Sequence, residues 1–252
     1  MKSAIGNIWT ITKRELQGYF TSPVAYVFII IFLLLSAGFA FFLGGFFERK
    51  DASLVSFFMW HPWIYLFLVP AVGMRLWSEE RRSGTIELLL TMPITAWQAI
   101  VGKYLASWIF LITALVLTFP VWITINYLGN PDNGVVLCGY IGSALVAGAY
   151  LAIASMTSAM TRNQVISFIV SVVFCVALAL IGFLADSPAA RRFLASLGME
   201  WAAGFAAAFG VVQHYETFQR GVVDVRDLVF FASIMLFGLF TTGVIIRSHR
   251  AG

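Results

Sequence analysis

Residues 78–93 carry the densest group of chemically active side chains in this chain of 252 residues. The order is Ser78-Glu79-Glu80-Arg81-Arg82, then Ser83-Gly84-Thr85, then Ile86-Glu87-Leu88-Leu89-Leu90-Thr91-Met92-Pro93. Long apolar runs flank this charged island on both sides, so it must lie in water at a membrane surface. Charges next to exposed leucines predict a rigid knob that docks onto a soluble partner.

A short helix is predicted inside the island, over residues 86–91. Thr85 would cap its first turn, and the negative charge of Glu87 in that turn would interact favourably with the helix dipole. Gly84 would give the backbone freedom before the helix, and Pro93 would end it. Its apolar residues would then form a docking ridge, unless they simply dip into the lipid headgroups: Ile86, Leu88, Leu89 and Leu90. A second helix start follows, because Thr95-Ala96-Trp97-Gln98 has capping-box spacing.

Residues that could bind nucleotides or metals are sparse. A Walker A loop would need Gly-Lys-[Ser/Thr], but Gly102-Lys103 is followed by Tyr104 and enters an apolar run. We therefore expect no ATPase activity on this chain. His61 is expected to be interfacial, near the outer end of a span. His214 has no second histidine at ligand spacing, so no metal site and no other cofactor is predicted.

Composition sets the class of protein that must position the island. Hydrophobic residues make up 60% of the chain and charged residues only 11%, unlike a soluble domain. Cys138 and Cys175 lie in apolar runs without CxxC spacing, which indicates buried thiols. We predict an all-α integral membrane protein forming a single domain over residues 1–252, with spans of about 20 residues. The expected spans are residues 23–47, 54–76, 100–128, 135–160, 165–184 and 228–246.

The distribution of charges predicts the orientation. The side with the island and both termini has ten cations and four acids, and the other side has six cations and eight acids. Because cations accumulate on the cytoplasmic side, we expect the island and both termini in the cytoplasm of a bacterial cell. The chain would cross the inner membrane several times. The mixed, charged start is not typical of a cleaved signal peptide.

The first 22 residues predict an amphipathic elbow helix in the membrane interface. Apolar residues recur at the spacing of one helix face, and aromatic and basic residues suit the headgroup region. Its expected interfacial residues are Trp9, Lys13, Arg14 and Tyr19. Either this helix is a simple anchor, or it moves with the bundle when a cytoplasmic partner pushes on it.

The outer stretch 186–227 is long for a connecting loop. Its apolar part, residues 201–210, is only about half a span long. We therefore expect a re-entrant or interfacial helical segment between spans five and six; the alternative is a short helix that caps the bundle. Small residues in span four, around Gly139 and Gly148, would allow close helix packing. Pro70 and Pro120 would kink spans two and three.

The island resembles the cytoplasmic loop of ABC-2-type transporter permeases. The matching residues are Glu79-Glu80, then Ser83-Gly84-Thr85-Ile86-Glu87-Leu88-Leu89-Leu90, and Pro93. In that family the loop, here 78–98, is a coupling helix that enters a cleft on the ATPase subunit. The resemblance implies that Glu79, Glu80, Arg81, Gly84, Thr85, Ile86, Glu87, Leu88 and Leu89 couple to that subunit. Residues 22–26 and 213–227 are similar to the small permeases of the gliding-motility-associated branch, with the copper-enzyme-maturation branch as an alternative.

The resemblance also implies partners. They would be two copies of an ABC ATPase, a second permease chain in a homodimer or heterodimer, the lipid bilayer and a possible external accessory protein. No nucleic acid is expected. Two readings compete with this ATP-driven exporter or force transmitter. A passive channel or scaffold would leave the island unexplained, and a membrane-embedded enzyme would need a nucleophile with a base, or a metal set, that the sequence lacks.

Overall fold

The structure is a computed structural model that describes residues 4–44, 53–85, 94–188, 192, 196, 204 and 208–248. Over these residues the chain is helical, and six helical stretches are long and apolar enough to cross a membrane. This confirms the predicted all-helical, multi-pass membrane fold. The stretches are Pro23–Leu43, Val55–Ser83, Ala96–Leu128, Asn133–Met160, Gln164–Gly182 and Val225–Ser248.

Several of these spans consist of more than one helix. The first joins α2 (Pro23–Gly38) to a π-helical turn, η1 (Phe39–Leu43). The second contains α3 (Val55–Phe58), α4 (His61–Gly73) and α5 (Arg75–Ser83). The third is α7 (Ala96–Val116) followed by α8 (Phe119–Leu128). The last three are α9 (Asn133–Met160), α10 (Gln164–Asp186) and α14 (Val225–Ser248).

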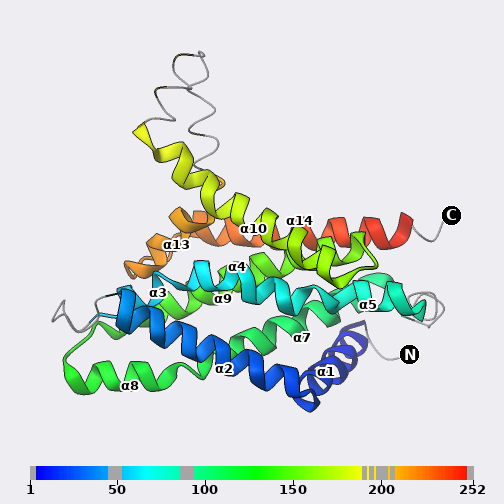
Figure 1. Cartoon of the computed structure of the whole chain (residues 1–252), viewed down its shortest axis with the longest axis horizontal. Helices are drawn as coiled ribbons and strands as arrows, with labels where there is room; N and C mark the ends of the chain where they lie inside the picture. The colour runs from blue at the N-terminus through cyan, green and yellow to red at the C-terminus, as the bar shows by residue number, and fades with distance from the viewer. Residues whose placement is uncertain are drawn as a thin grey trace.

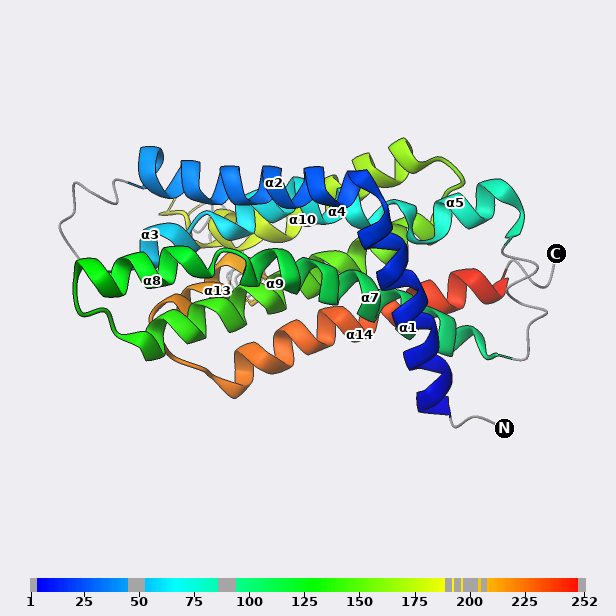
Figure 2. The same cartoon turned by 90° about the horizontal axis from the view of Figure 1, so that it is seen from below.

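Two further helices lie at opposite ends of the bundle. α1 (Ala4–Thr21) lies across the long axis of the spans, at the end that also holds α5 and the last turn of α14 (Figures 1 and 2). α13 (Val211–Gln219) lies at the other end, beside α3. These are called the α5 end and the α13 end below. Six of the ten residues of the predicted segment 201–210 lie outside the described residues, so its position stays a prediction.

α9 is the central helix, packed against α4, α7, α10, α13 and α14. Its small residues allow this. A Cβ added to Gly139 would lie 2.5 Å from the Phe58 ring, and one added to Gly238 of α14 would lie 2.8 Å from the Ala152 carbonyl oxygen. Such close approach is what small residues permit between membrane helices. The small-residue rows of span four thus serve packing within the bundle.

The two prolines that were expected to kink spans two and three lie close to helix ends. Pro70 is inside α4, which ends at Gly73. Pro120 is in the first turn of α8 and not inside a continuous helix, so span three is divided between Val116 and Phe119. The reason is that proline suits the first turn of a helix, where its missing N–H is not needed. Thr95 and Gln98 form the predicted capping box that begins α7.

The junction between α4 and α5 is held by a side chain from α9. Ser158 Oγ accepts from the Trp77 and Ser78 backbone N–H groups, at 3.0 Å each, and donates to the Met74 carbonyl at 2.8 Å. A hydroxyl inserted into the backbone ladder is a known cause of a helix bend. The break between α4 and α5 at Met74 is therefore held by α9 as well as by the local sequence.

We expect Ser158→Ala to destabilise the protein, because it removes one side chain that satisfies three backbone groups. The expected loss is about 1–3 kcal/mol of unfolding free energy, the cost of leaving buried polar groups unpaired. Unfolding in mild detergent would measure it. Ser233→Ala is the matched control, since Ser233 is exposed on α14 and bonds only its own helix at Val229. Equal stability of both variants would contradict the assigned role of Ser158.

Candidate functional site

The charged island begins on a helix and not in a loop. α5 extends to Ser83 and carries Glu79, Glu80, Arg81 and Arg82, so the expected end of span two at residue 76 is seven residues too early. Gly84 ends α5 with a left-handed φ of 73°, a conformation that glycine adopts at little cost. The backbone freedom expected of Gly84 is thus used at the end of α5.

The Thr85 hydroxyl lies 2.9 Å from Ser83 Oγ, so its described contacts return to α5. The predicted helix over 86–91 lies outside the described residues. So do its coupling residues Ile86, Glu87, Leu88 and Leu89, and their role stays a prediction. The described part of the site consists of the two helices that flank this segment, α5 before it and α7 after it.

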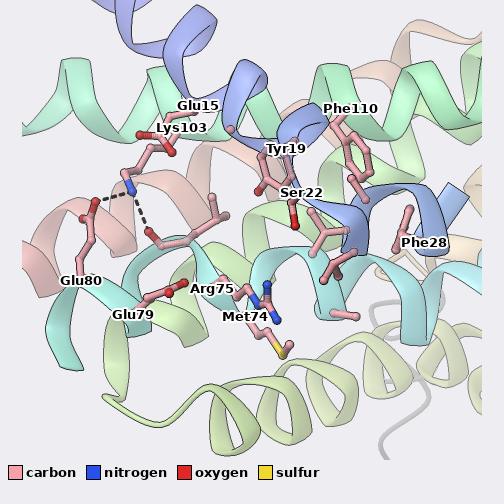
Figure 3. Close-up of a pocket in the computed structure, with 16 residues that line it drawn as sticks. Glu15, Tyr19, Ser22, Phe28, Met74, Arg75, Glu79, Glu80, Lys103 and Phe110 are labelled. Carbon is pink, nitrogen blue, oxygen red and sulfur yellow. Dashed lines mark hydrogen bonds and ion pairs between the residues drawn. The ribbon is translucent and has the colours of Figure 1, made fainter. Parts of the chain in front are cut away.

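A buried ion pair joins these two flanking helices. Lys103 Nζ of α7 lies 2.6 Å from Glu80 Oε1 of α5, and the two side chains are 7% and 20% exposed. The same ammonium donates to the Leu76 carbonyl at 3.2 Å (Figure 3). It also lies 5.2 Å from the Trp77 ring centroid. A charge with so little solvent is tolerated because it is paired and hydrogen-bonded. Glu80 is therefore engaged inside the bundle, contrary to its expected place on a solvated knob.

The other island charges divide between the bundle and solvent. Arg81 Nη1 donates to the Ala159 carbonyl, close to the end of α9. A cation next to the last carbonyls of a helix is favourable. Glu79 and Arg82 are exposed. Of the predicted coupling residues before Gly84, two thus hold α5 in place and only Glu79 faces solvent. Arg82, which was not among the predicted coupling residues, is also accessible to a partner.

The elbow helix α1 is docked on α7 through polar contacts. The Thr12 hydroxyl is 3.1 Å from the Gly102 carbonyl, and the Tyr19 hydroxyl is 2.9 Å from Ser107 Oγ. Burial at this contact raises the pKa of Tyr19 to about 12, so its hydroxyl stays protonated. Trp9, Lys13 and Arg14 are exposed. These three predicted interfacial residues thus remain free of the bundle, whereas Tyr19 belongs to its packing.

A contiguous set of contacts therefore joins the helices that precede and follow residues 86–93 in the chain. Lys103 and Glu80 join α7 to α5, while α1 is attached to α7 and α5 to α9. Polar contacts thus connect four helices, α1, α5, α7 and α9, at this end of the bundle. Lys103 was missed as a site residue, since the sequence counted it only as a charge near the end of a span.

His61, at the α13 end, was expected to be interfacial, and the structure shows that this prediction is wrong. It is fully buried and not interfacial. Its Nδ1 lies 2.8 Å from Ser143 Oγ, which lies 2.7 Å from the Tyr215 hydroxyl, and Tyr215 donates to the Phe58 carbonyl at 3.1 Å. This chain links α3, α4, α9 and α13. Pro62, the next residue, suits a first helical turn, which places His61 at the start of α4 within the bundle.

His214 also has partners that the sequence did not indicate. Its Nδ1 lies 2.6 Å from Asp227 Oδ1, and its Nε2 lies 3.0 Å from the Ala208 carbonyl. Thr217 donates to the second Asp227 oxygen. The cluster ties α13 to the first turn of α14. Among the residues that the structure describes, no three His, Cys, Asp or Glu side chains gather in a way that could hold a metal ion.

Comparison with known proteins gives two matches. The model of the family described as "ABC-2 family transporter protein" matches residues 54–209, which is more than half of the chain. A probable ABC transporter permease protein of Pseudomonas aeruginosa, NosY, is 27% identical over 174 residues. That alignment covers 62% of this chain and 61% of the permease, so the chain spans less than two thirds of this relative's length.

The ion pair between α5 and α7 can be tested by a double-mutant cycle. We expect Lys103→Met or Glu80→Met alone to cost about 3–5 kcal/mol of unfolding free energy, because each leaves a buried charge unpaired. The double variant should cost clearly less than the sum of the two. Unfolding in detergent would give the four free energies.

The exposed pair Arg14 and Glu15 is the control, with Arg14 62% exposed. Arg14→Met should cost no more than about 1 kcal/mol. Additive effects of the Lys103 and Glu80 substitutions would show that the two residues stabilise α5 and α7 independently, and would contradict the junction.

Proposed function

The chain belongs to the ABC-2 family of transporter proteins, and we propose that it uses ATP hydrolysis on a separate chain to export a substrate or to transmit force to an external partner. Membership supports a transmembrane subunit of an ABC transporter that works with an ABC ATPase. The observation that carries the proposal is the junction of Glu80 and Lys103, on the two helices that flank the predicted coupling segment.

The proposed orientation places the α5 end in the cytoplasm of a bacterial cell, with both termini there. The exposed cations Lys13, Arg14 and Arg82 are all at this end. The excess of cations there agrees with the positive-inside rule. ATP and Mg²⁺ would bind to the ATPase subunits, expected in two copies, and a second permease chain would complete the membrane part. Any external accessory protein would meet the α13 end.

In the proposed mechanism, ATPase closure pushes on residues 86–93. The push reaches α5 and α7 together, because an ion pair joins them, with Lys103 Nζ 2.6 Å from Glu80 Oε1. From α7 it passes to α1 through Thr12 and Tyr19, and from α5 to α9 through Arg81 and the Ser158 contact. Because the Ser158 hydroxyl bonds Met74, Trp77 and Ser78 across the junction of α4 and α5, these two helices would move together with α9. A linked set of this kind converts a local displacement into a rigid movement.

The docking test must avoid Glu80, since reversing its charge would place two ammonium groups at a buried site. Arg82 is exposed beside the segment and is the cleaner choice. We expect Arg82→Glu to weaken co-purification of the ATPase about tenfold, which corresponds to about 1.4 kcal/mol. Leu89→Glu, on the predicted docking ridge, should abolish co-purification, because it places a charge in an apolar contact. Mass spectrometry of chains purified in mild detergent would identify and quantify the ATPase.

Arg220→Glu is the matched control, because Arg220 is an exposed arginine at the α13 end with a side chain 75% exposed. It should leave the ATPase bound. Retention of the ATPase by all three variants would refute docking at the segment. If folded wild-type protein recovers no Walker A ATPase, the passive channel or scaffold is favoured instead.

A further inference from the structure

We propose that a cavity at the α5 end binds the headgroup region of one phosphatidylethanolamine molecule, with the lipid phosphate at Arg75 and its ammonium at Glu79. The cavity has a volume of about 430 Å³ and lies between α1, α2, α4, α5 and α7. This inference does not depend on the transport role. It rests on the lining of the cavity, its charges and its place between an amphipathic helix and the first span.

The lining is polar on one side and apolar on the other (Figure 3). Glu79, Glu80 and Lys103 lie on one side of the close-up, and Phe28 and Phe110 lie on the other, with Arg75 between the two groups. A soluble ion would make no use of the aromatic side. An amphipathic molecule with a charged head and an apolar body would use both sides.

The charges available in the cavity match a zwitterion. Lys103 and Glu80 neutralise each other at 2.6 Å, and Glu15 pairs with Arg14 at 2.8 Å. Arg75 and Glu79 remain, and neither has an ion pair within the described part of the chain. Residues four apart on a helix are neighbours, with Cβ atoms about 5–6 Å apart. This presents one cation and one anion side by side, as the phosphate and ammonium of an ethanolamine headgroup require.

The position of the cavity identifies a membrane lipid as the source of that headgroup. α1 ends at Thr21 and the first span begins at Pro23, so Ser22, which lines the cavity, is at the start of the apolar region. The Ser22 hydroxyl makes no cap bond to α2 and can donate to a phosphate oxygen. Val24 and Val27 continue from there along α2, each 54% exposed. They give the acyl chains an apolar surface that leads away from the cavity.

The same charges predict selectivity against other phospholipids. Phosphatidylglycerol carries a phosphate without an ammonium, so Glu79 would face a net negative headgroup. Phosphatidylcholine has an ammonium without N–H donors and would not hydrogen-bond Glu79. Selectivity of this kind combines a matched contact with a repulsive one for the competitor. A bound lipid would bridge α2 and α5 and so stabilise their present arrangement.

Native mass spectrometry of the delipidated protein, titrated with single phospholipids, tests the proposal. We expect one phosphatidylethanolamine to bind the wild-type chain about tenfold more tightly than phosphatidylglycerol. Arg75→Gln should weaken phosphatidylethanolamine about tenfold, and Glu79→Gln should remove the preference over phosphatidylglycerol. Arg82→Gln, on the same helix but outside the cavity lining, should bind as wild type does.

Two outcomes would overturn the proposal. One is equal binding of both lipids to the wild type and to every variant, which would show a non-selective lipid surface. The other is equally tight binding of soluble glycerophosphoethanolamine, which would show a phosphate site that needs no acyl chains. All the substituted side chains are exposed, so the folded state should survive each change.

Discussion

The arrangement of the α5 end depends on the cost of burying a charge. Lys103 is an ammonium in an apolar helix, and it is stable there only because Glu80, the Leu76 carbonyl and the Trp77 ring surround it. Isolated in that place, either charge would destabilise the fold by several kcal/mol. This requirement ties α5 to α7, the two helices that precede and follow residues 86–93. The attachment of α1 to α7, and of α5 to α9, then extends the fixed region to four helices.

The rest of the bundle is organised around α9. In its most apolar window 67% of the residues are buried, against 22% for the first span and 28% for each of the last two. Van der Waals packing of small residues is the main attraction available between helices in lipid. Gly139, Gly148 and Ala152 supply the close contacts, while Ser143 and Ser158 supply hydroxyls to neighbouring helices. A single helix therefore carries both the packing and the polar connections.

The sequence was sufficient for the features that depend on local pattern. The six spans and the capping box at Thr95 follow from composition and spacing, and the structure confirms them, although the helix of span two continues to Ser83. It failed where a distant partner decides the outcome. Charged residues from Glu79 onward indicated a loop, but α5 continues because Lys103 and the Ala159 carbonyl receive those charges. His61 was misplaced for the same reason, since Ser143, far along the chain, makes its burial acceptable.

The burial of α9 among other helices determines which helices respond to a change in the bilayer. Changes in bilayer thickness act on helices through the lipid that they touch, at a cost of fractions of a kcal/mol per ångström of mismatch. The first, third, fifth and sixth spans are the least buried, at 22–33%, whereas α9 is packed between α4, α7, α10, α13 and α14. A thinner or thicker membrane would therefore tilt the peripheral helices about a central helix that keeps its own length and hydrogen bonds. Membrane composition thus becomes a mechanical input, applied at the rim of the bundle.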